Sequence, residues 1–196
     1  MFELPLIEWI AVVLAIIYVV LAARASAWCW PFAFVSSCLW SYQVYIAYDL
    51  YFDAALNVFY AVMALVGLWQ WQRSRAKQNI PEQPLAIRSM RATEHLAWIG
   101  GGALVTVLGV VLAKAYTEAA LPLPDATTTV YSIIGTILLI QRKLENWLYL
   151  LAMDVVYVWL YLDRGSVLFA GLFVVYCILA VYGYLSWRQR MQGQPA

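Results

Sequence analysis

The chain has 196 residues, of which 65% are hydrophobic and only 12% are charged. Soluble domains are about half apolar and about a quarter charged, so this composition excludes a water-soluble fold. The net charge of +1 gives no basis for nucleic-acid binding. We therefore predict an all-α integral membrane protein in which residues 1–196 form a single membrane domain.

Seven apolar segments are long enough to cross a bilayer, whose hydrocarbon core of about 30 Å requires roughly 20 helical residues. The fifth and sixth segments are the shortest. The predicted spans are approximately Leu6–Ala23, Trp28–Tyr48, Asp53–Trp71, His95–Ala115, Ala126–Gln141, Asn146–Tyr161 and Val167–Trp187.

The basic residues predict the orientation. If the amino terminus lies outside and the carboxyl terminus lies in the cytoplasm, ten of the twelve Lys and Arg residues are cytoplasmic, and only Lys114 and Arg164 lie outside. The cytoplasmic set is Arg24, Arg73, Arg75, Lys77, Arg88, Arg91, Arg142, Lys143, Arg188 and Arg190. The basic loop from Arg73 to Glu94 is interpreted as a solvated connector that contacts anionic lipid.

The sequence also contains an internal repeat. At a shift of 116 residues, Tyr45 aligns with Tyr161. Six further residues also align with identical ones at this shift: Ala54, Leu56, Tyr60, Ala64, Gly67 and Trp71. The pattern predicts parallel repeats in a 3+1+3 arrangement: repeat 1 at about 6–72, a linker loop and fourth helix at about 73–115, and repeat 2 at about 126–188. Such bundles are typical of transporters, with the substrate near the midplane where the repeats meet.

Asp154 is the main candidate for a binding residue. An ionisable group inside a membrane costs about 2.5 kcal/mol or more, so it is a functional candidate by default. Asn146, Leu150, Tyr157 and Tyr161 share its helical face. A carboxylate among aromatic rings suits a flat cationic solute through ion pairing and cation–π contact. The alternative is an Asp that only holds helices together through hydrogen bonds.

Further candidates lie in the first repeat. Asp53, Asn57 and Tyr60 form a polar stripe on the third predicted helix. Asn57 is the deeper candidate, whereas Asp53 also fits a charge favoured by the helix dipole. Trp40 and Gln43, with Trp28 and Trp30, are candidates for lining a substrate path on the second helix.

Other residues are interpreted as structural. Trp69, Trp71 and Trp187 adjoin cytoplasmic arginines and are interpreted as interfacial belt residues. Gly67 and Gly183 are expected to permit close helix packing rather than to act as hinges. His95 and the three cysteines, Cys29, Cys38 and Cys177, are expected to be structural, the cysteines as small core residues.

The sequence provides no basis for catalysis. It lacks a glycine-rich phosphate loop, a His/Glu metal cluster and a nucleophile with a base, so we expect no cofactor and no metal. An intramembrane enzyme would need a second reactive group near Asp154. A non-transporting scaffold is the other alternative, and would tolerate replacement of Asp154 by Leu.

Three stretches carry a family resemblance: RKLENWLYLLAMDVVYVWLY at 142–161, WCWPFAF at 28–34 and DLYFDAALNVFY at 49–60. Together they resemble the PnuC family of vitamin transporters, which shares the 3+1+3 layout of SWEET proteins. The resemblance implies uptake of nicotinamide riboside across the inner membrane by facilitated diffusion, with trapping by a cytoplasmic kinase, and implies a homo-oligomer.

The resemblance also implies a binding site on the sixth helix. Members carry a Trp, a second Trp three residues later, and Asn or Asp four residues further on. Trp147 and Asp154 match the first and last of these, whereas Leu150 replaces the middle Trp and Tyr149 and Tyr157 are expected to compensate.

Departures elsewhere leave the vitamin open. Asn57 stands where relatives often have Gln, and Ser26 and Ala33 replace an expected Asn and Gly. Relatives specialised for thiamine or riboflavin are therefore alternatives. Because nicotinamide riboside and thiamine are cationic heteroaromatics, the argument from Asp154 fits both, and it fits neutral riboflavin less well.

Overall fold

The computed structural model describes residues 3–48, 51–76, 86–116, 122–163, 165 and 167–193. These residues form seven helices, and the predicted all-α fold is confirmed. The helices are α1 (Glu3–Ala23), α2 (Cys29–Tyr48), α3 (Tyr51–Ala76), α4 (Ala92–Tyr116), α5 (Pro122–Ile140), α6 (Asn146–Asp163) and α7 (Val167–Gln192). They group into two compact units, residues 1–85 and 86–196.

Five helices are long and apolar enough to cross a membrane among the described residues: α1, α3, α4, α5 and α7. The other two, α2 and α6, contain many Trp and Tyr residues and buried polar groups such as Gln43 and Asn146, which lower their mean apolarity. They are also the two helices that the predicted repeat pairs with each other.

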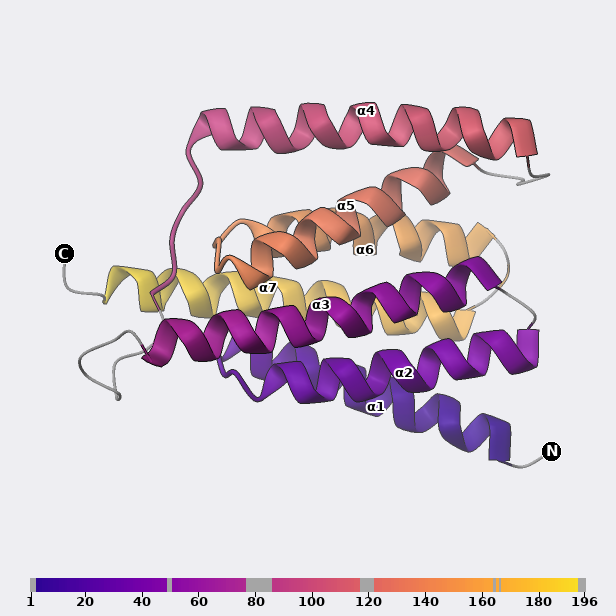
Figure 1. The fold of residues 1–196 in the computed structure, drawn as a ribbon, viewed down its shortest axis with the longest axis horizontal. Coiled ribbons are helices and arrows are strands. Elements are labelled where there is room, and N and C mark those ends of the chain that lie inside the picture. The colour runs from indigo at the N-terminus through magenta and orange to yellow at the C-terminus, as the bar shows by residue number, and fades with distance from the viewer. Residues whose placement is uncertain are drawn as a thin grey trace. The chain divides into compact units, whose positions relative to one another are not determined.

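In the first unit, α1, α2 and α3 are successively antiparallel, and α2 packs against both of its neighbours (Figure 1). Ser36 Oγ donates a hydrogen bond to Ala11 O of α1 at 2.8 Å, and Ser41 Oγ donates to Ala54 O of α3 at 2.9 Å. The middle helix is thus tied to both partners by hydroxyl groups that are satisfied inside the unit.

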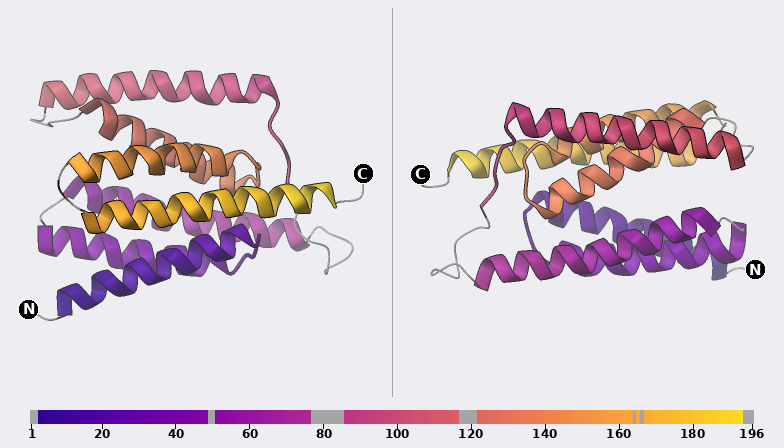
Figure 2. Two further views of the ribbon diagram at one scale, coloured as in Figure 1. Left: turned by 180° about the vertical axis from the view of Figure 1, so that it is seen from behind. Right: turned by 45° about the horizontal axis from the view of Figure 1, so that its top comes forward.

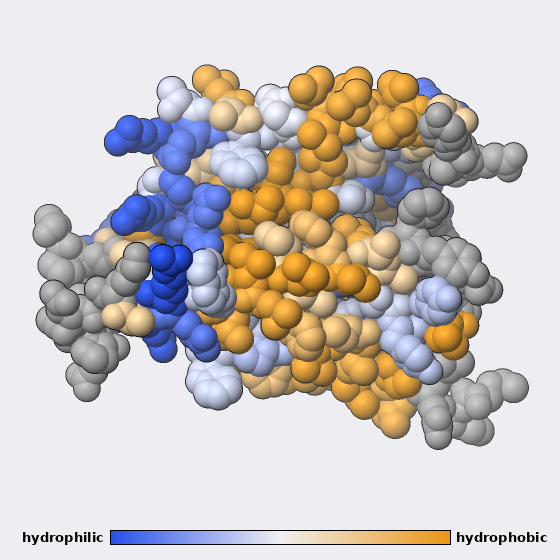
Figure 3. Space-filling view, in the orientation of Figure 1, coloured by the Kyte–Doolittle hydropathy of each residue, from blue (hydrophilic) through white to orange (hydrophobic). Residues whose placement is uncertain are grey.

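In the second unit, α6 packs between α5 and α7, and α4 packs along α5 (Figure 2). Gly102 and Gly109 of α4 face α5, next to Tyr131 and Ala126 respectively. The rest of α4 is largely apolar and exposed, and hydrophilic residues gather at its amino-terminal end (Figure 3). This pattern fits a helix whose free face lies in lipid.

Each unit contains the same contact between a tryptophan and a glycine. A Cβ built on Gly67 would lie 2.6 Å from the Trp30 ring, and one on Gly183 would lie 2.6 Å from the Trp147 ring. Trp30 also meets Trp71 edge-on with ring centroids 5.3 Å apart, and Trp147 meets Trp187 at 5.6 Å. The predicted packing role of both glycines is confirmed.

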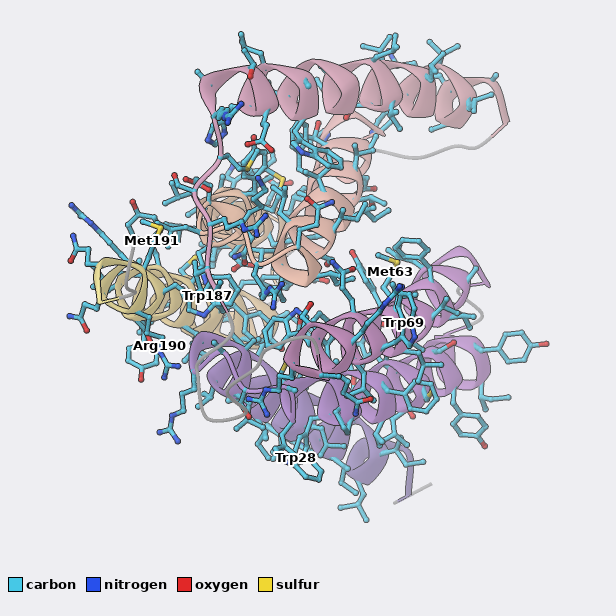
Figure 4. The ribbon with its side chains drawn as sticks, turned by 60° about the vertical axis from the view of Figure 1, so that its left-hand side comes forward. Trp28, Met63, Trp69, Trp187, Arg190 and Met191 are labelled. Atoms are coloured by element: carbon cyan, nitrogen blue, oxygen red, sulfur yellow. The ribbon has the colours of Figure 1, made fainter. Side chains whose placement is uncertain are left out.

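This contact corrects the assignment of two tryptophans to the interfacial belt. Trp71 and Trp187 are fully buried, because each packs one turn beyond the glycine that receives its partner ring. Trp69 is 59% exposed, with the Arg73 guanidinium 5.1 Å from its ring centre, as expected of a belt residue. Trp28 and Trp187 are labelled in Figure 4: Trp28 is 71% exposed, whereas Trp187 is buried.

The turns before α2 and α6 also share one geometry. Ser26 N donates to Leu21 O at 3.0 Å, and Lys143 N donates to Leu138 O at 2.9 Å. The residue before each donor, Ala25 or Arg142, has a positive φ, 50° and 59° respectively. Both turns are therefore Schellman caps in which a residue other than glycine adopts the left-handed conformation.

The caps fix the sequence register of the repeat. Arg142 follows Ala25 by 117 residues, and at this shift the buried Cys29, Trp30 and Gln43 of α2 match the buried Asn146, Trp147 and Leu160 of α6. In α3 and α7 the buried Ala54, Ala64 and Trp71 match the buried Ala170, Ala180 and Trp187 at 116 residues. The predicted pairing of Tyr45 with Tyr161 is therefore wrong by one residue.

The cysteine prediction is partly wrong. Cys29 is buried and Cys177 is partly buried, but Cys38 is exposed on α2. It borders a shallow groove of about 600 Å³ between α2 and α3, which is lined mainly by apolar side chains such as Phe34 and Leu65.

We predict that Gly183→Ala will lower the thermal stability of the detergent-solubilised protein. The added methyl group must displace the Trp147 ring, and overpacking of this kind costs about 1–3 kcal/mol. Gly171→Ala on the same helix is the matched control, because a Cβ there meets nothing within 4 Å. Equal melting temperatures for the two variants would contradict the close packing.

Candidate binding site on α6 and α7

The start of α6 determines which way its side chains face. Trp147 is seated on Gly183 of α7, and Asp154 follows Trp147 by seven residues, or about two helical turns. Asp154 consequently lies on the α7 side of α6, where it is partly buried and within electrostatic reach of Tyr176 and Cys177. A carboxylate inside the unit thus faces an aromatic helix.

A set of stacked aromatic rings continues from Asp154 along the same helix pair; we call it the aromatic ladder. Tyr157 stacks on Phe173 with ring centroids 4.5 Å apart, and Tyr161 stacks on both Phe173 and Phe169 at 5.4 Å. Tyr176 meets Phe173 edge-on at 5.6 Å. The ladder consists of Tyr157, Tyr161, Phe169, Phe173 and Tyr176.

The ladder residues on α7 were not predicted as site residues from the sequence. Phe169, Phe173 and Tyr176 recur at i, i+4 and i+7, which places them on one helical face. That spacing was the available signal, together with the repeat that pairs Tyr176 with Tyr60. In an apolar helix the same spacing fits ordinary packing equally well, so the signal alone did not distinguish a site.

Two predicted site residues, Asn146 and Trp147, form the first turn of α6. Asn146 is fully buried and donates from Nδ2 to Lys143 O at 2.6 Å. Among the described residues, Asn146 Oδ1 and Trp147 Nε1 are buried without a hydrogen-bond partner. Trp147 therefore acts first as a packing residue, and both side chains retain one polar atom that a further group could satisfy.

Tyr149 does not join the ladder. Its hydroxyl oxygen lies 3.2 Å from His95 Nδ1, and its ring stacks on His95 with centroids 6.0 Å apart and on Tyr131 of α5 with centroids 6.4 Å apart. Leu150 likewise packs on Gly135 of α5. The structure thus places Tyr149 and Leu150 on the α5 side and Asp154, Tyr157 and Tyr161 on the α7 side.

The remaining predicted site residues lie in the first unit. Gln43 is 1% exposed and its Oε1 has no partner among the described residues, whereas Trp40 and Asn57 are partly buried. The side chain of Asp53 lies outside the described residues. The groove between α2 and α3 is lined by neither Gln43 nor Asn57 and has no charged lining residue, so it does not suit a charged solute.

The described residues contain no group of three or more His, Cys, Asp or Glu side chains that could hold a metal ion. What the α6–α7 pair offers is one carboxylate beside π faces, an arrangement that stabilises a flat organic cation by Coulomb attraction and by cation–π contacts worth about 0.5–2 kcal/mol. The chemistry of these side chains is therefore suited to binding such a cation.

Comparison with known proteins identifies the family. A family model described as nicotinamide mononucleotide transporter matches residues 5–189. The chain belongs to this transporter family. The resemblance to PnuC proteins inferred from the sequence is thereby confirmed, and the protein is a multi-pass membrane protein of a transporter family.

Two relatives and one solved structure extend the comparison. The riboflavin/roseoflavin transporter RibM of Streptomyces davaonensis is 28% identical over 93% of this chain and 85% of its own length. The nicotinamide riboside transporter PnuC of Neisseria mucosa is 26% identical over 94% of this chain and 74% of its own. A crystal structure of the vitamin B3 transporter PnuC has the same fold, with a TM-score of 0.79, 22% identity, and coverage of 96% of this chain and 83% of that one.

We predict that Phe173→Leu will destabilise the α6–α7 pair, because Phe173 stacks on two tyrosines and each aromatic pair contributes about 0.5–1.5 kcal/mol beyond its buried area. Near-ultraviolet circular dichroism and thermal unfolding measure the effect. Trp159→Leu is the control, since Trp159 is 52% exposed on α6 and is not part of the ladder. An unchanged spectrum and melting temperature for Phe173→Leu would contradict the stacked arrangement.

Proposed function

We propose that this protein takes up nicotinamide riboside by facilitated diffusion, and that the Asp154 carboxylate beside the aromatic ladder binds the pyridinium ring. The observation that carries the proposal is the position of Asp154, which lies mid-helix on α6 and faces Tyr176 of α7. A permanent positive charge on a flat ring complements both the carboxylate and the π faces.

The charge pattern favours a nucleoside over a nucleotide. The sequence has no Lys or Arg between Lys114 and Arg142, between Lys143 and Arg164, or between Arg164 and Arg188. The spans of α5, α6 and α7 therefore supply no cation for a phosphate group, and Asp154 would repel one. Although the family model is named for a mononucleotide, these helices suit the dephosphorylated form.

Riboflavin is the second candidate, because the relative with 28% identity is a riboflavin/roseoflavin transporter. Its ring system would stack on the ladder but carries no positive charge for Asp154. Thiamine, a cationic heteroaromatic, fits the same chemistry as nicotinamide riboside. We further propose that a cytoplasmic kinase traps the transported nucleoside and that the protein assembles as a homo-oligomer.

We predict that purified protein in detergent will bind nicotinamide riboside more tightly than riboflavin or thiamine, with intrinsic tryptophan fluorescence as the readout. Asp154→Asn should weaken this binding about tenfold or more, because removing one partner of a charge pair costs at least about 1.4 kcal/mol. Asp163→Asn, at the exposed end of the same helix, is the matched control. Tighter binding of riboflavin, with no effect of Asp154→Asn, would favour the second candidate.

We also propose that the amino terminus lies outside and the carboxyl terminus in the cytoplasm. In a variant without native cysteines, Asp163→Cys should react with a membrane-impermeant maleimide in intact spheroplasts. Gly193→Cys, at the opposite end of α7, should react only after permeabilisation. The reverse pattern would invert the topology.

A further inference from the structure

A short segment before α4, residues 86–91, is attached to the turn between α5 and α6. Arg88 N donates to Arg142 O at 3.0 Å, and Leu144 N donates to Arg88 O at 2.9 Å. These bonds form an isolated parallel bridge between Arg88 and Lys143. We call the segment and the turn residues 142–145 together the clasp.

Glu145 is the buried charge at the centre of the clasp. Its side chain is 8% exposed, and its two carboxylate oxygens accept hydrogen bonds from Ser89 Oγ and, at 2.9 Å, from Met90 N. Its carbonyl oxygen accepts from Leu148 N at 3.0 Å, so Glu145 is also the N-cap residue, directly before the first residue of α6. The carboxylate thus binds a segment 55 residues away instead of capping its own helix.

Further contacts join the start of α4 to the same region. Lys143 Nζ lies 2.7 Å from Glu94 Oε1, and Glu94 Oε2 accepts from Arg91 N at 2.8 Å. Met90 is buried in an apolar cluster with Ile134 and Leu138 of α5. With the contact between His95 and Tyr149 described above, the first turn of α4 is connected to both α5 and α6.

The clasp also has an electrostatic cost. Burial lowers the pKa of the Arg142 guanidinium, and the nearby charge of Arg88 lowers it further. Two like charges are therefore held close together, in a backbone conformation at Arg142 that is itself unfavourable for a residue other than glycine. The hydrogen bonds from Ser89 and Met90 to Glu145, and the ion pair between Lys143 and Glu94, stabilise the clasp against this cost.

We infer that Glu145 is a positioning residue for transport: it holds α4 and the first turn of α6 together as one element, so that the helix bearing Trp147 and Asp154 moves together with α4. This inference rests on the proposed function. Asp154 lies nine residues beyond Glu145, about 13 Å along the helix. Loss of the clasp should therefore change the rate of transport more than the affinity of the site.

The test compares Glu145→Ala with wild type in three measurements. Hydrogen–deuterium exchange should become faster in the peptide covering residues 86–91, because the Met90 amide loses its acceptor, and should stay unchanged in α7. The dissociation constant for nicotinamide riboside in detergent should stay within about twofold. Uptake into proteoliposomes should be about tenfold slower, at an unchanged half-saturation concentration.

Two variants control for a purely structural effect. Glu145→Gln retains a carbonyl oxygen for Met90 N, so it should restore most of the uptake. Glu94→Gln removes an ion pair whose carboxylate is 38% exposed, and such pairs contribute little, so its uptake should stay near that of wild type.

The inference is overturned if Glu145→Ala transports at the wild-type rate despite faster exchange. It is also overturned if affinity, uptake and exchange in α7 change together, because Glu145 would then be a general packing residue. If wild type binds riboflavin or thiamine instead, the proposed substrate is wrong, and the same comparison with that vitamin still decides the role of Glu145. If the wild-type protein binds none of the three vitamins, the exchange measurement alone decides. Unaltered exchange at residues 86–91 in Glu145→Ala would then show that Glu145 does not hold this segment, and would overturn the inference.

Discussion

The arrangement of each helix pair depends on one tryptophan ring packed directly on a glycine. Trp147 on Gly183 brings α6 and α7 close together and fixes the rotation of α6 about its axis. Because Asp154 and Tyr161 follow Trp147 at intervals of seven residues, that single contact determines that both face α7. The carboxylate and the aromatic ladder therefore take their positions from a packing contact near the end of the helix.

The two units share the same helix packing but carry different side chains at equivalent positions. At the shift of 117 residues that the caps define, Asp154 corresponds to Ser37, so the first unit has a hydroxyl and no charge at that position of its middle helix. At the shift of 116 residues in the following helix, Phe173 corresponds to Asn57. The second unit thus pairs a carboxylate with an aromatic ring where the first has two neutral polar groups, while the tryptophan, glycine and cap positions stay equivalent.

Local patterns in the sequence predicted the helices, the packing glycines and the prominence of Asp154, because hydropathy and residue size act over one or two turns. Predictions failed where a contact depends on another helix. Arginines next to Trp187 suggested an interface, but Gly183 and Trp147 bury its ring. Tyr149 was expected near the substrate, but it lies two residues after Trp147 and therefore on the opposite side of α6, where His95, 54 residues away, contacts it. The contact between Glu145 and Met90 spans 55 residues and leaves no periodic signal.

The paired indoles give each unit its own chromophore. Trp30 with Trp71 and Trp147 with Trp187 are buried, nearly perpendicular and separated by 5.3 and 5.6 Å, close enough for their electronic transitions to couple. Any rotation of α2 against α3, or of α6 against α7, alters the angle between two transition dipoles. The same rings that fix the helices therefore make the geometry of the pairs visible to spectroscopy without an added label.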